Sequence, residues 1–134
     1  MTTVAAPPAL AQFEITQKFF FDAAHTLQRE IEAEGSRRIH GHTYHAEVTL
    51  AGTPHADTGM VVDLGRVRLA IAELRPQLDH QLLDEVPGLG PATLENLAAF
   101  VWRGMESRLP QVVQVRVWRE ALGDGCTLRR SPQP

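Results

Sequence analysis

Two segments near the start of the chain have the residue pattern of β-strands. Residues 13–24 (FEITQKFFFDAA) are rich in aromatic and β-branched side chains, and residues 42–51 (HTYHAEVTLA) mostly alternate between polar and apolar. Both patterns favour strands. The charged stretch between them, residues 26–39, is interpreted as a helical turn followed by a loop. Residues 52–59 begin and end with glycine and contain a proline, which predicts a turn.

Two apolar stripes with helical spacing follow. The first begins after Asp63, whose side chain can accept hydrogen bonds from the free backbone N–H groups of the first turn. Its members are Leu64, Val67, Ile71, Leu74 and Leu78. Pro76 falls inside this stripe, so we expect the helix to bend or break there. Residues 86–92 hold two prolines and two glycines and form a connection.

The second helix is predicted to begin at Thr93, a candidate N-cap, and to be stopped by Pro110. Its apolar stripe is Leu94, Leu97, Ala98, Val101, Met105 and Leu109. Residues 111–120 then alternate as a third strand, and residues 126–130 form a short fourth strand after a turn at 123–125. The order is therefore β-β-α-α-β-β. Two amphipathic helices on one face of an antiparallel four-stranded sheet define an α+β domain.

Length and composition narrow the class of protein. A chain of 134 residues predicts one domain, which we expect to span residues 11–130 between flexible tails at residues 1–10 and 131–134. Apolar residues make up 43% and charged residues 22%, which are ordinary globular values. The net charge of −3 lacks the basic excess of a dedicated nucleic-acid binder.

Cysteine content and hydropathy favour a soluble, cytoplasmic protein. A single cysteine, Cys126, excludes an intrachain disulfide and a cysteine-rich zinc site, and it fits a reducing compartment. No apolar run approaches the roughly 18 residues of a membrane span. The N-terminal segment has no basic region of the kind that begins a signal peptide. We expect no membrane or nucleic-acid partner.

Three of the six histidines have the spacing of a metal site. His40 and His42 are two positions apart at the start of a strand, which puts both imidazoles on one face. His25 ends the first strand, and a hairpin would bring it beside them. Three neutral imidazoles can bind zinc and leave a fourth position open, as in catalytic rather than structural sites. The alternative is that the pair consists of exposed strand residues.

Two other sequence features could take part in proton transfer or ligand binding. Asp79 and His80 are expected to end the first helix, whose dipole favours a charged imidazole and where the carboxylate can orient the ring. A solvated helix end is the alternative. Glu120 follows the third strand, and a carboxylate there can accept two hydrogen bonds from the N–H/NH2 edge of a guanidine-like ring. Alone it would be an ordinary surface glutamate.

Six short motifs in order carry a resemblance to a known family. They are FDAAH (21–25), HGHTY (40–44), GMVVDL (59–64), LDHQLL (78–83), TLENLA (93–98) and VWRE (117–120). Over residues 13–128 the chain resembles the 6-pyruvoyltetrahydropterin synthase / 6-carboxytetrahydropterin synthase family. This resemblance implies the tunnelling fold, in which three subunits join their sheets into a barrel and two trimers stack into a hexamer, with active sites between subunits. The open edges of a small sheet also favour association.

The same resemblance implies a ligand and a substrate. Zinc would be held by His25, His40 and His42. The substrate would be 7,8-dihydroneopterin triphosphate, whose side-chain oxygens zinc can hold while it acidifies neighbouring protons. Triphosphate is then lost, and in the 6-carboxy branch the side chain is cut with release of acetaldehyde. The pathway, whether queuosine, biopterin or folate, stays open.

Roles for four further residues follow from the resemblance. Asp79 and His80 would form a proton-relay pair that reaches the site from a neighbouring subunit. Glu120 would anchor the 2-amino and N3 edge of the pterin, and Thr93 would line the pterin pocket.

One departure from the family concerns the catalytic base. The family's cysteine stands four positions before the first paired histidine in the 6-carboxy branch, where this chain has Ser36. In the animal 6-pyruvoyl branch the cysteine stands six positions before that histidine, where this chain has Glu34. A branch that makes a folate intermediate uses a glutamate three positions before it, where this chain has Arg37. A serine hydroxyl is a far poorer base than a thiol with a pKa of about 8.5. Either Glu34 or Glu32 is the base, or zinc-bound water is, or the usual reaction is not run.

Three functions are therefore compared. The first is a zinc-dependent pterin synthase or lyase of this family. The second is a related enzyme with altered chemistry, such as retro-aldol cleavage of the side chain of dihydroneopterin or its triphosphate. The third is a non-catalytic oligomer that binds a pterin or purine.

Overall fold

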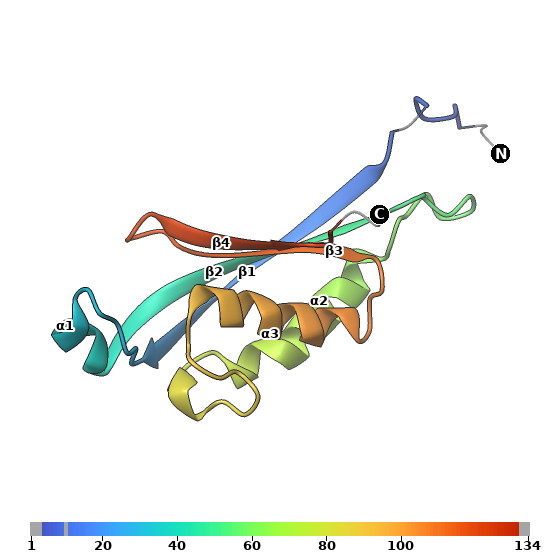
Figure 1. Ribbon diagram of the computed structural model, residues 1–134. Helices are drawn as coiled ribbons and strands as arrows, with labels where there is room; N and C mark the ends of the chain where they lie inside the picture. The colour runs from blue at the N-terminus through green and yellow to red at the C-terminus, as the bar shows by residue number, and fades with distance from the viewer. Residues whose placement is uncertain (1–3, 10, 132–134) are drawn as a thin grey trace.

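The fold, seen in a computed structural model that describes residues 4–9 and 11–131, is built on one four-stranded antiparallel sheet. The strands follow one another in chain order across the sheet: β1 (Phe13–His25), β2 (His40–Gly52), β3 (Val112–Arg119) and β4 (Asp124–Arg129). Two helices, α2 (Leu64–Leu74) and α3 (Leu94–Glu106), lie together against one face of it (Figure 1). The predicted α+β class and element order are confirmed.

The first two strands form a long, unbroken hairpin arm. They pair from Phe13 opposite Gly52 to His25 opposite His40. The second strand begins two residues earlier than predicted, because every residue from His40 onward finds a partner in β1. The segment between the strands contains the short helix α1 (Ala33–Arg37), which projects at one end of the molecule in Figure 1.

The core lies between the sheet and the two helices. Alternate residues of β2 and β3 are buried there, and they meet the apolar stripe of α3. Phe21 and Tyr44, paired across β1 and β2, stack with ring centroids 5.1 Å apart. The helices approach closely at Gly104, where an added Cβ would lie 2.8 Å from a methyl group of Leu74.

Both predicted helix starts are confirmed by their capping bonds, and both helix ends need correction. Asp63 accepts from the Gly65 amide at 2.8 Å, and Thr93 accepts from the Asn96 amide at 3.1 Å. Helix α2 ends at Leu74, and a 3-10 turn, η1 (Arg75–Gln77), follows, in line with a break near the proline. Helix α3 ends at Glu106, several residues before the proline that was expected to stop it.

The segment after η1 runs along the outer edge of β1. Its amide and carbonyl groups bond to β1 at Asp22 and Ala24, and Leu82 forms an isolated parallel bridge with Ala24. This segment and the next 3-10 turn, η2 (Leu83–Glu85), therefore cover the C-terminal part of an otherwise open edge strand.

The remaining differences from the sequence prediction are local. Strand β4 begins at Asp124, inside the expected turn. Of the expected tails, residues 4–9 have no helix or strand, whereas residues 1–3, 10 and 132–134 lie outside the described residues. Within the described part of the chain, every helix is too short or too polar to cross a membrane.

Candidate metal and catalytic site

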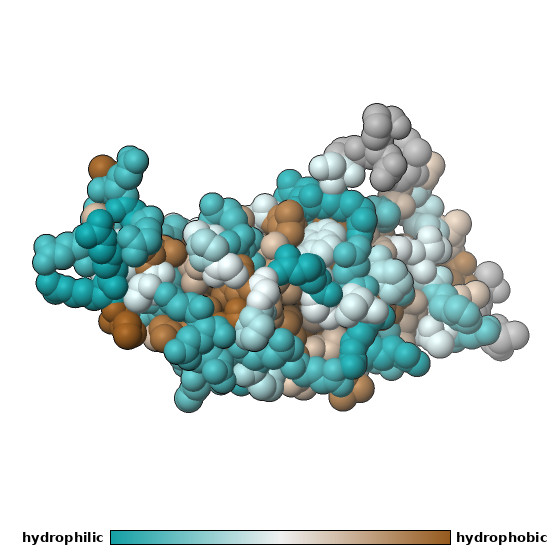
Figure 2. Space-filling model, turned by 60° about the horizontal axis from the view of Figure 1, so that its bottom comes forward, coloured by the Kyte–Doolittle hydropathy of each residue, from teal (hydrophilic) through white to brown (hydrophobic). Residues whose placement is uncertain are grey.

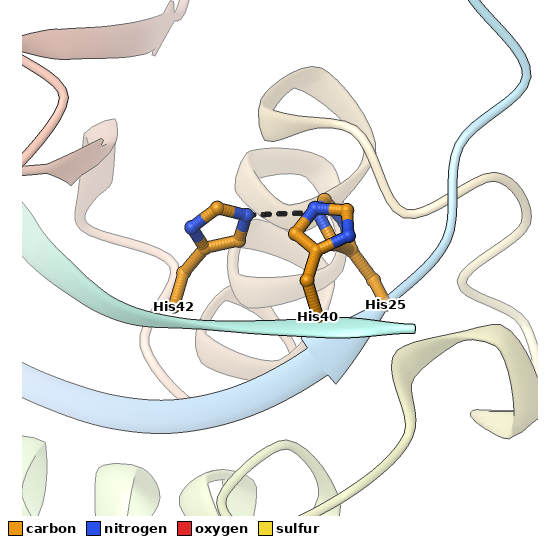
Figure 3. Close-up of side chains that lie close together, drawn as sticks. All are labelled: His25, His40 and His42. Carbon is orange, nitrogen blue, oxygen red and sulfur yellow. Dashed lines mark hydrogen bonds between the residues drawn. The ribbon is translucent and has the colours of Figure 1, made fainter. Parts of the chain in front are cut away.

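Three histidine rings meet at one end of the β1–β2 hairpin arm, where β1 ends and β2 begins. His25 is the last residue of β1, and His40 and His42 are the first and third residues of β2. Their rings rise on the same side of the two strands (Figure 3). The Nε2 atom of His25 is 2.9 Å from that of His40 and 3.0 Å from that of His42. The hairpin register thus brings together the residues that the sequence suggested as ligands.

Backbone carbonyl groups orient two of these rings. Nδ1 of His25 is 2.9 Å from the carbonyl oxygen of Ala92, and Nδ1 of His40 is 2.7 Å from that of Arg38. A carbonyl can only accept, so in each ring Nδ1 carries the proton and Nε2 presents a lone pair. Such second contacts are typical of histidines that bind a metal.

The donor set fits a metal ion. The lone pairs of His25 and His40, which face one another at 2.9 Å, repel unless a cation lies between them. Burial lowers the pKa of His25, and burial together with the Arg119 guanidinium lowers that of His42 to about 4. Both rings are therefore neutral near pH 7, the form in which imidazole binds metal.

A cavity of about 750 Å³ opens over the three histidines. Its walls come from α1 and the loop before it, from the start of α3, and from the β3–β4 turn. The polar residues that line it include Glu32, Ser36, Thr93, Glu95, Arg119 and Asp124. Figure 2 shows the outer side of this region: a mostly hydrophilic projection at the end where α1 lies, with hydrophobic residues between it and the helices.

The three base candidates occupy different positions. Ser36 is buried and lines the cavity, and its hydroxyl donates to the Ala33 carbonyl at 3.0 Å. Glu32 also lines the cavity and has a left-handed backbone with φ 59°, which a glutamate adopts at a cost. Glu34 is not among the lining residues; its side chain is 86% exposed and pairs with Arg38 at 3.0 Å. Glu32 is similar in both respects, because its side chain is 72% exposed and pairs with Arg29 at 3.1 Å. Its place in the cavity lining is therefore what favours Glu32 over Glu34.

Thr93 lines the cavity, but its hydroxyl is engaged in capping α3. Its hydroxyl hydrogen stays free to donate, while the oxygen already accepts from the helix.

Asp79 and His80 lie elsewhere, and their expected position at the end of the first helix is wrong. They occupy the turn between η1 and η2, beyond the helix end, and His80 has a left-handed backbone with φ 59°. An Asp79 oxygen accepts from the Asp22 amide at 2.9 Å. Another is 3.8 Å from Nε2 of His80, whose side chain is 79% exposed. The carboxylate is therefore held in place while the imidazole faces solvent.

Glu120 also faces away from the cavity. Its carboxylate accepts from the indole Nε1 of Trp118 at 2.9 Å, and the Trp118 ring stacks on His45 with centroids 5.4 Å apart. His45 is one position out of phase with the cavity-facing side chains of β2, so this group lies on the sheet face opposite to the helices. Within one chain, the histidine cluster, the Asp79–His80 pair and Glu120 do not form one site.

One charged pair beside the histidines was given no role by the sequence reasoning. Arg119 and Asp124 form a two-bond ion pair across the β3–β4 turn, and Nη1 of Arg119 is 3.3 Å from Nε2 of His42. The sequence does contain a pattern that could have identified Arg119: it continues the two-residue alternation of the core-facing Val115 and Val117. An arginine in phase with core residues at a strand end points toward the interior.

Comparison with known proteins agrees with this fold. The family model described as 6-pyruvoyl tetrahydropterin synthase matches residues 14–131. The chain belongs to this family. It is 35% identical to a 6-pyruvoyl tetrahydrobiopterin synthase of Poecilia reticulata over 118 residues, covering 78% of this chain and 80% of the relative.

The chain is also similar to relatives named 6-carboxy-tetrahydropterin synthases. The chain is 35% identical to a 6-carboxy-5,6,7,8-tetrahydropterin synthase of a Synechocystis strain over 98 residues, covering 69% and 74% of the two chains. Among solved structures, the Caenorhabditis elegans 6-pyruvoyl tetrahydropterin synthase matches with a TM-score of 0.78 at 22% identity, covering 90% of this chain and 97% of that one. A Plasmodium vivax 6-pyruvoyl tetrahydropterin synthase matches with a TM-score of 0.69 at 16% identity, covering 91% and 99%. Further structures of that P. vivax enzyme carry replacements of a glutamate described as catalytic.

Proposed function

We propose that this chain is a zinc-dependent pterin-converting enzyme that acts on 7,8-dihydroneopterin triphosphate or a close relative. The convergence of three Nε2 atoms carries the proposal: those of His40 and His42 each lie about 3 Å from that of His25. Membership of a family of tetrahydropterin synthases supplies the substrate class. Zinc bound there would polarise oxygen atoms of the substrate side chain and acidify the neighbouring C–H groups.

The side chains around the cavity suggest how the substrate is held and deprotonated. Glu32 lines the cavity and is the group we assign as base, taking a proton from the substrate side chain. Ser36 replaces the family cysteine, but its hydroxyl proton is directed to the Ala33 carbonyl, so it is a weak candidate. The glutamate described as catalytic in the P. vivax enzyme is a precedent for a catalytic carboxylate in this fold.

Assembly of several copies completes the proposed site. Asp79, His80 and Glu120 lie outside the cavity of their own chain, so they can serve it only from other subunits. Glu120 would accept from the pterin 2-amino and N3 groups, and its bond from the Trp118 indole sets the direction of the carboxylate. The Asp79–His80 pair would return a proton as triphosphate leaves. A trimer or hexamer provides the required neighbours.

The test is incubation of zinc-loaded protein with 7,8-dihydroneopterin triphosphate, followed by identification of the pterin and of released triphosphate. Formation of a 6-pyruvoyl or 6-carboxy product with triphosphate supports a synthase. Pterin with a shortened side chain, together with a released aldehyde that still carries the phosphates, indicates retro-aldol cleavage. Tight pterin binding without turnover, at full zinc content, indicates the non-catalytic binding protein. The double variant of His40 and His42 to Ala serves as the metal-free control.

A further inference from the structure

The guanidinium group of Arg119 lies directly beside the three histidines. Arg119 is the last residue of β3, and its side chain lines the cavity with only 16% of its surface exposed. Its Nη1 atom is 3.3 Å from Nε2 of His42, the ring atom that faces His25. A permanent positive charge is thus placed next to a proposed cation site.

Asp124 holds this guanidinium in one orientation. The two residues are paired across β3 and β4, and their side chains form two parallel hydrogen bonds. Nε donates to Oδ1 at 2.9 Å and Nη2 donates to Oδ2 at 2.6 Å. Such a two-bond pair restricts both rotation and tilt of the guanidinium plane. The remaining nitrogen, Nη1, is therefore directed at the histidines.

This arrangement changes when a metal binds. The Nη1 hydrogen can bond to the lone pair of His42 Nε2 only while that lone pair is free. A metal would take that lone pair, so the Nη1 hydrogen that bonds to it would need another acceptor, in addition to the Tyr44 hydroxyl that the guanidinium also contacts. The metal and the guanidinium also repel each other in a partly buried cavity, where charges are poorly screened. A negatively charged oxygen at the open metal position removes both difficulties.

We propose that Arg119 recognises an anionic oxygen of the ligand that occupies the metal cavity. Nη1 donates to that oxygen, and Asp124 keeps the guanidinium in position to do so. This inference rests on the proposed function, because it needs a metal at the three histidines. It specifies the ligand further: a carboxylate, phosphate or enolate oxygen is preferred over a neutral group of the same shape.

Cobalt-loaded protein tests the proposal without turnover, because the visible spectrum of cobalt reports a change of its ligands. Acetate is titrated at constant ionic strength into the wild type, Arg119→Gln and Arg129→Gln. Arg129 is a matched control: it lies on β4 and its Nε donates to Gln114 at 2.8 Å, away from the cavity. We expect the acetate dissociation constant to rise roughly 10-fold in Arg119→Gln and to stay within about 2-fold of wild type in Arg129→Gln.

Two further measurements keep the outcome unambiguous. Acetamide, the neutral analogue, should bind the wild type more weakly than acetate. In zinc-loaded wild type, the 15N signal of the Arg119 guanidinium should shift on addition of acetate, which tests the contact even if Arg119→Gln does not fold.

Two results would overturn the proposal in distinguishable ways. Equal acetate affinity in the wild type and Arg119→Gln, together with an unchanged guanidinium signal, removes the role of Arg119 and leaves the metal site intact. Failure of the wild type to bind one equivalent of cobalt removes the metal site, and with it both the proposed function and this inference.

Discussion

The Nδ1 atom of His25 lies 2.9 Å from the carbonyl oxygen of Ala92, the residue directly before the N-cap of α3. This bond joins the end of β1 to the start of a helix 67 residues away in sequence. It turns the Nε2 lone pair of His25 toward the other two histidines. The hydroxyl of Tyr44 lies 3.3 Å from the same Nδ1. The helix layer therefore orients a ligand that the sheet carries.

Removal of two of the three histidines should abolish metal binding. We expect the His40→Ala/His42→Ala double variant to contain less than a tenth of the wild-type zinc by elemental analysis, because one remaining imidazole cannot replace a three-nitrogen site. His45→Ala is the matched control, since His45 is on the same strand but stacks on Trp118 on the opposite face. Zinc retained at one equivalent in the double variant would show that the ligands lie elsewhere.

The base is tested by substitutions in and before α1. Because Glu32 lines the cavity and Glu34 does not, Glu32→Gln should lower turnover roughly 10²–10⁴-fold, whereas Glu34→Gln should have little effect. Steady-state kinetics with 7,8-dihydroneopterin triphosphate measures this difference. Zinc content should be unchanged in both variants. A larger loss in Glu34→Gln than in Glu32→Gln would contradict the assignment.

Ser36 provides a separate prediction. Ser36→Ala should leave turnover nearly unchanged if the serine is not the base. Ser36→Cys should raise it if a thiol at this buried position can lose its proton near the metal. Both variants are compared in the same product assay, with far-UV circular dichroism as the control for folding. Loss of all activity in Ser36→Ala would make the serine hydroxyl essential.

Asp84 should stabilise the fold in a pH-dependent way. It accepts from the Thr26 amide at 2.9 Å and also from the Thr26 hydroxyl, directly after His25. Partial burial raises the pKa of Asp84, but these hydrogen bonds outweigh burial and hold the pKa below its ordinary value. Because the folded-state pKa is the lower one, the stabilisation is present above the unfolded-state value of about 3.9 and is lost as pH falls through the folded-state value.

The corresponding experiment compares Asp84→Asn with wild type by urea unfolding. At pH 7 the variant should be less stable by about 1 kcal/mol, a figure that allows for solvent exposure of the carboxylate. The difference should shrink at pH 3. Asp57→Asn, in an exposed loop, is the control for the charge change. A difference that stays constant between pH 7 and pH 3 would exclude the hydrogen bonds as its cause.

The protein should associate in solution. The sheet ends in β1 and β4, and the exposed hydrophobic side chains include Phe13 and Phe20 of β1. The proposed site also needs Asp79 and Glu120 from neighbouring copies. We expect a trimer or hexamer by multi-angle light scattering at micromolar concentration. A stable monomer that still turns over pterin would rule out a site shared between subunits.

The sequence alone determined the order of the elements and the face on which the histidines lie. Two-residue alternation places His40 and His42 on one side of a strand, and the capping residues Asp63 and Thr93 mark where the helices begin. These are local properties, set within a few residues by backbone geometry. They could therefore be predicted without knowing what the chain packs against.

The tertiary structure alone decided which distant groups meet at the site. Arg119 reaches His42 because β3 pairs with β2, and the two residues are 77 positions apart. Glu32 rather than Glu34 lines the cavity because of the path that the chain takes into the five-residue helix α1. A helix this short shows no apolar stripe, so its orientation could not be predicted from the sequence. Asp79 lies against the edge of β1 because the chain leaves the helix at η1. Strand register and loop path set such contacts, and neither is encoded in a local pattern of hydrophobic and polar residues.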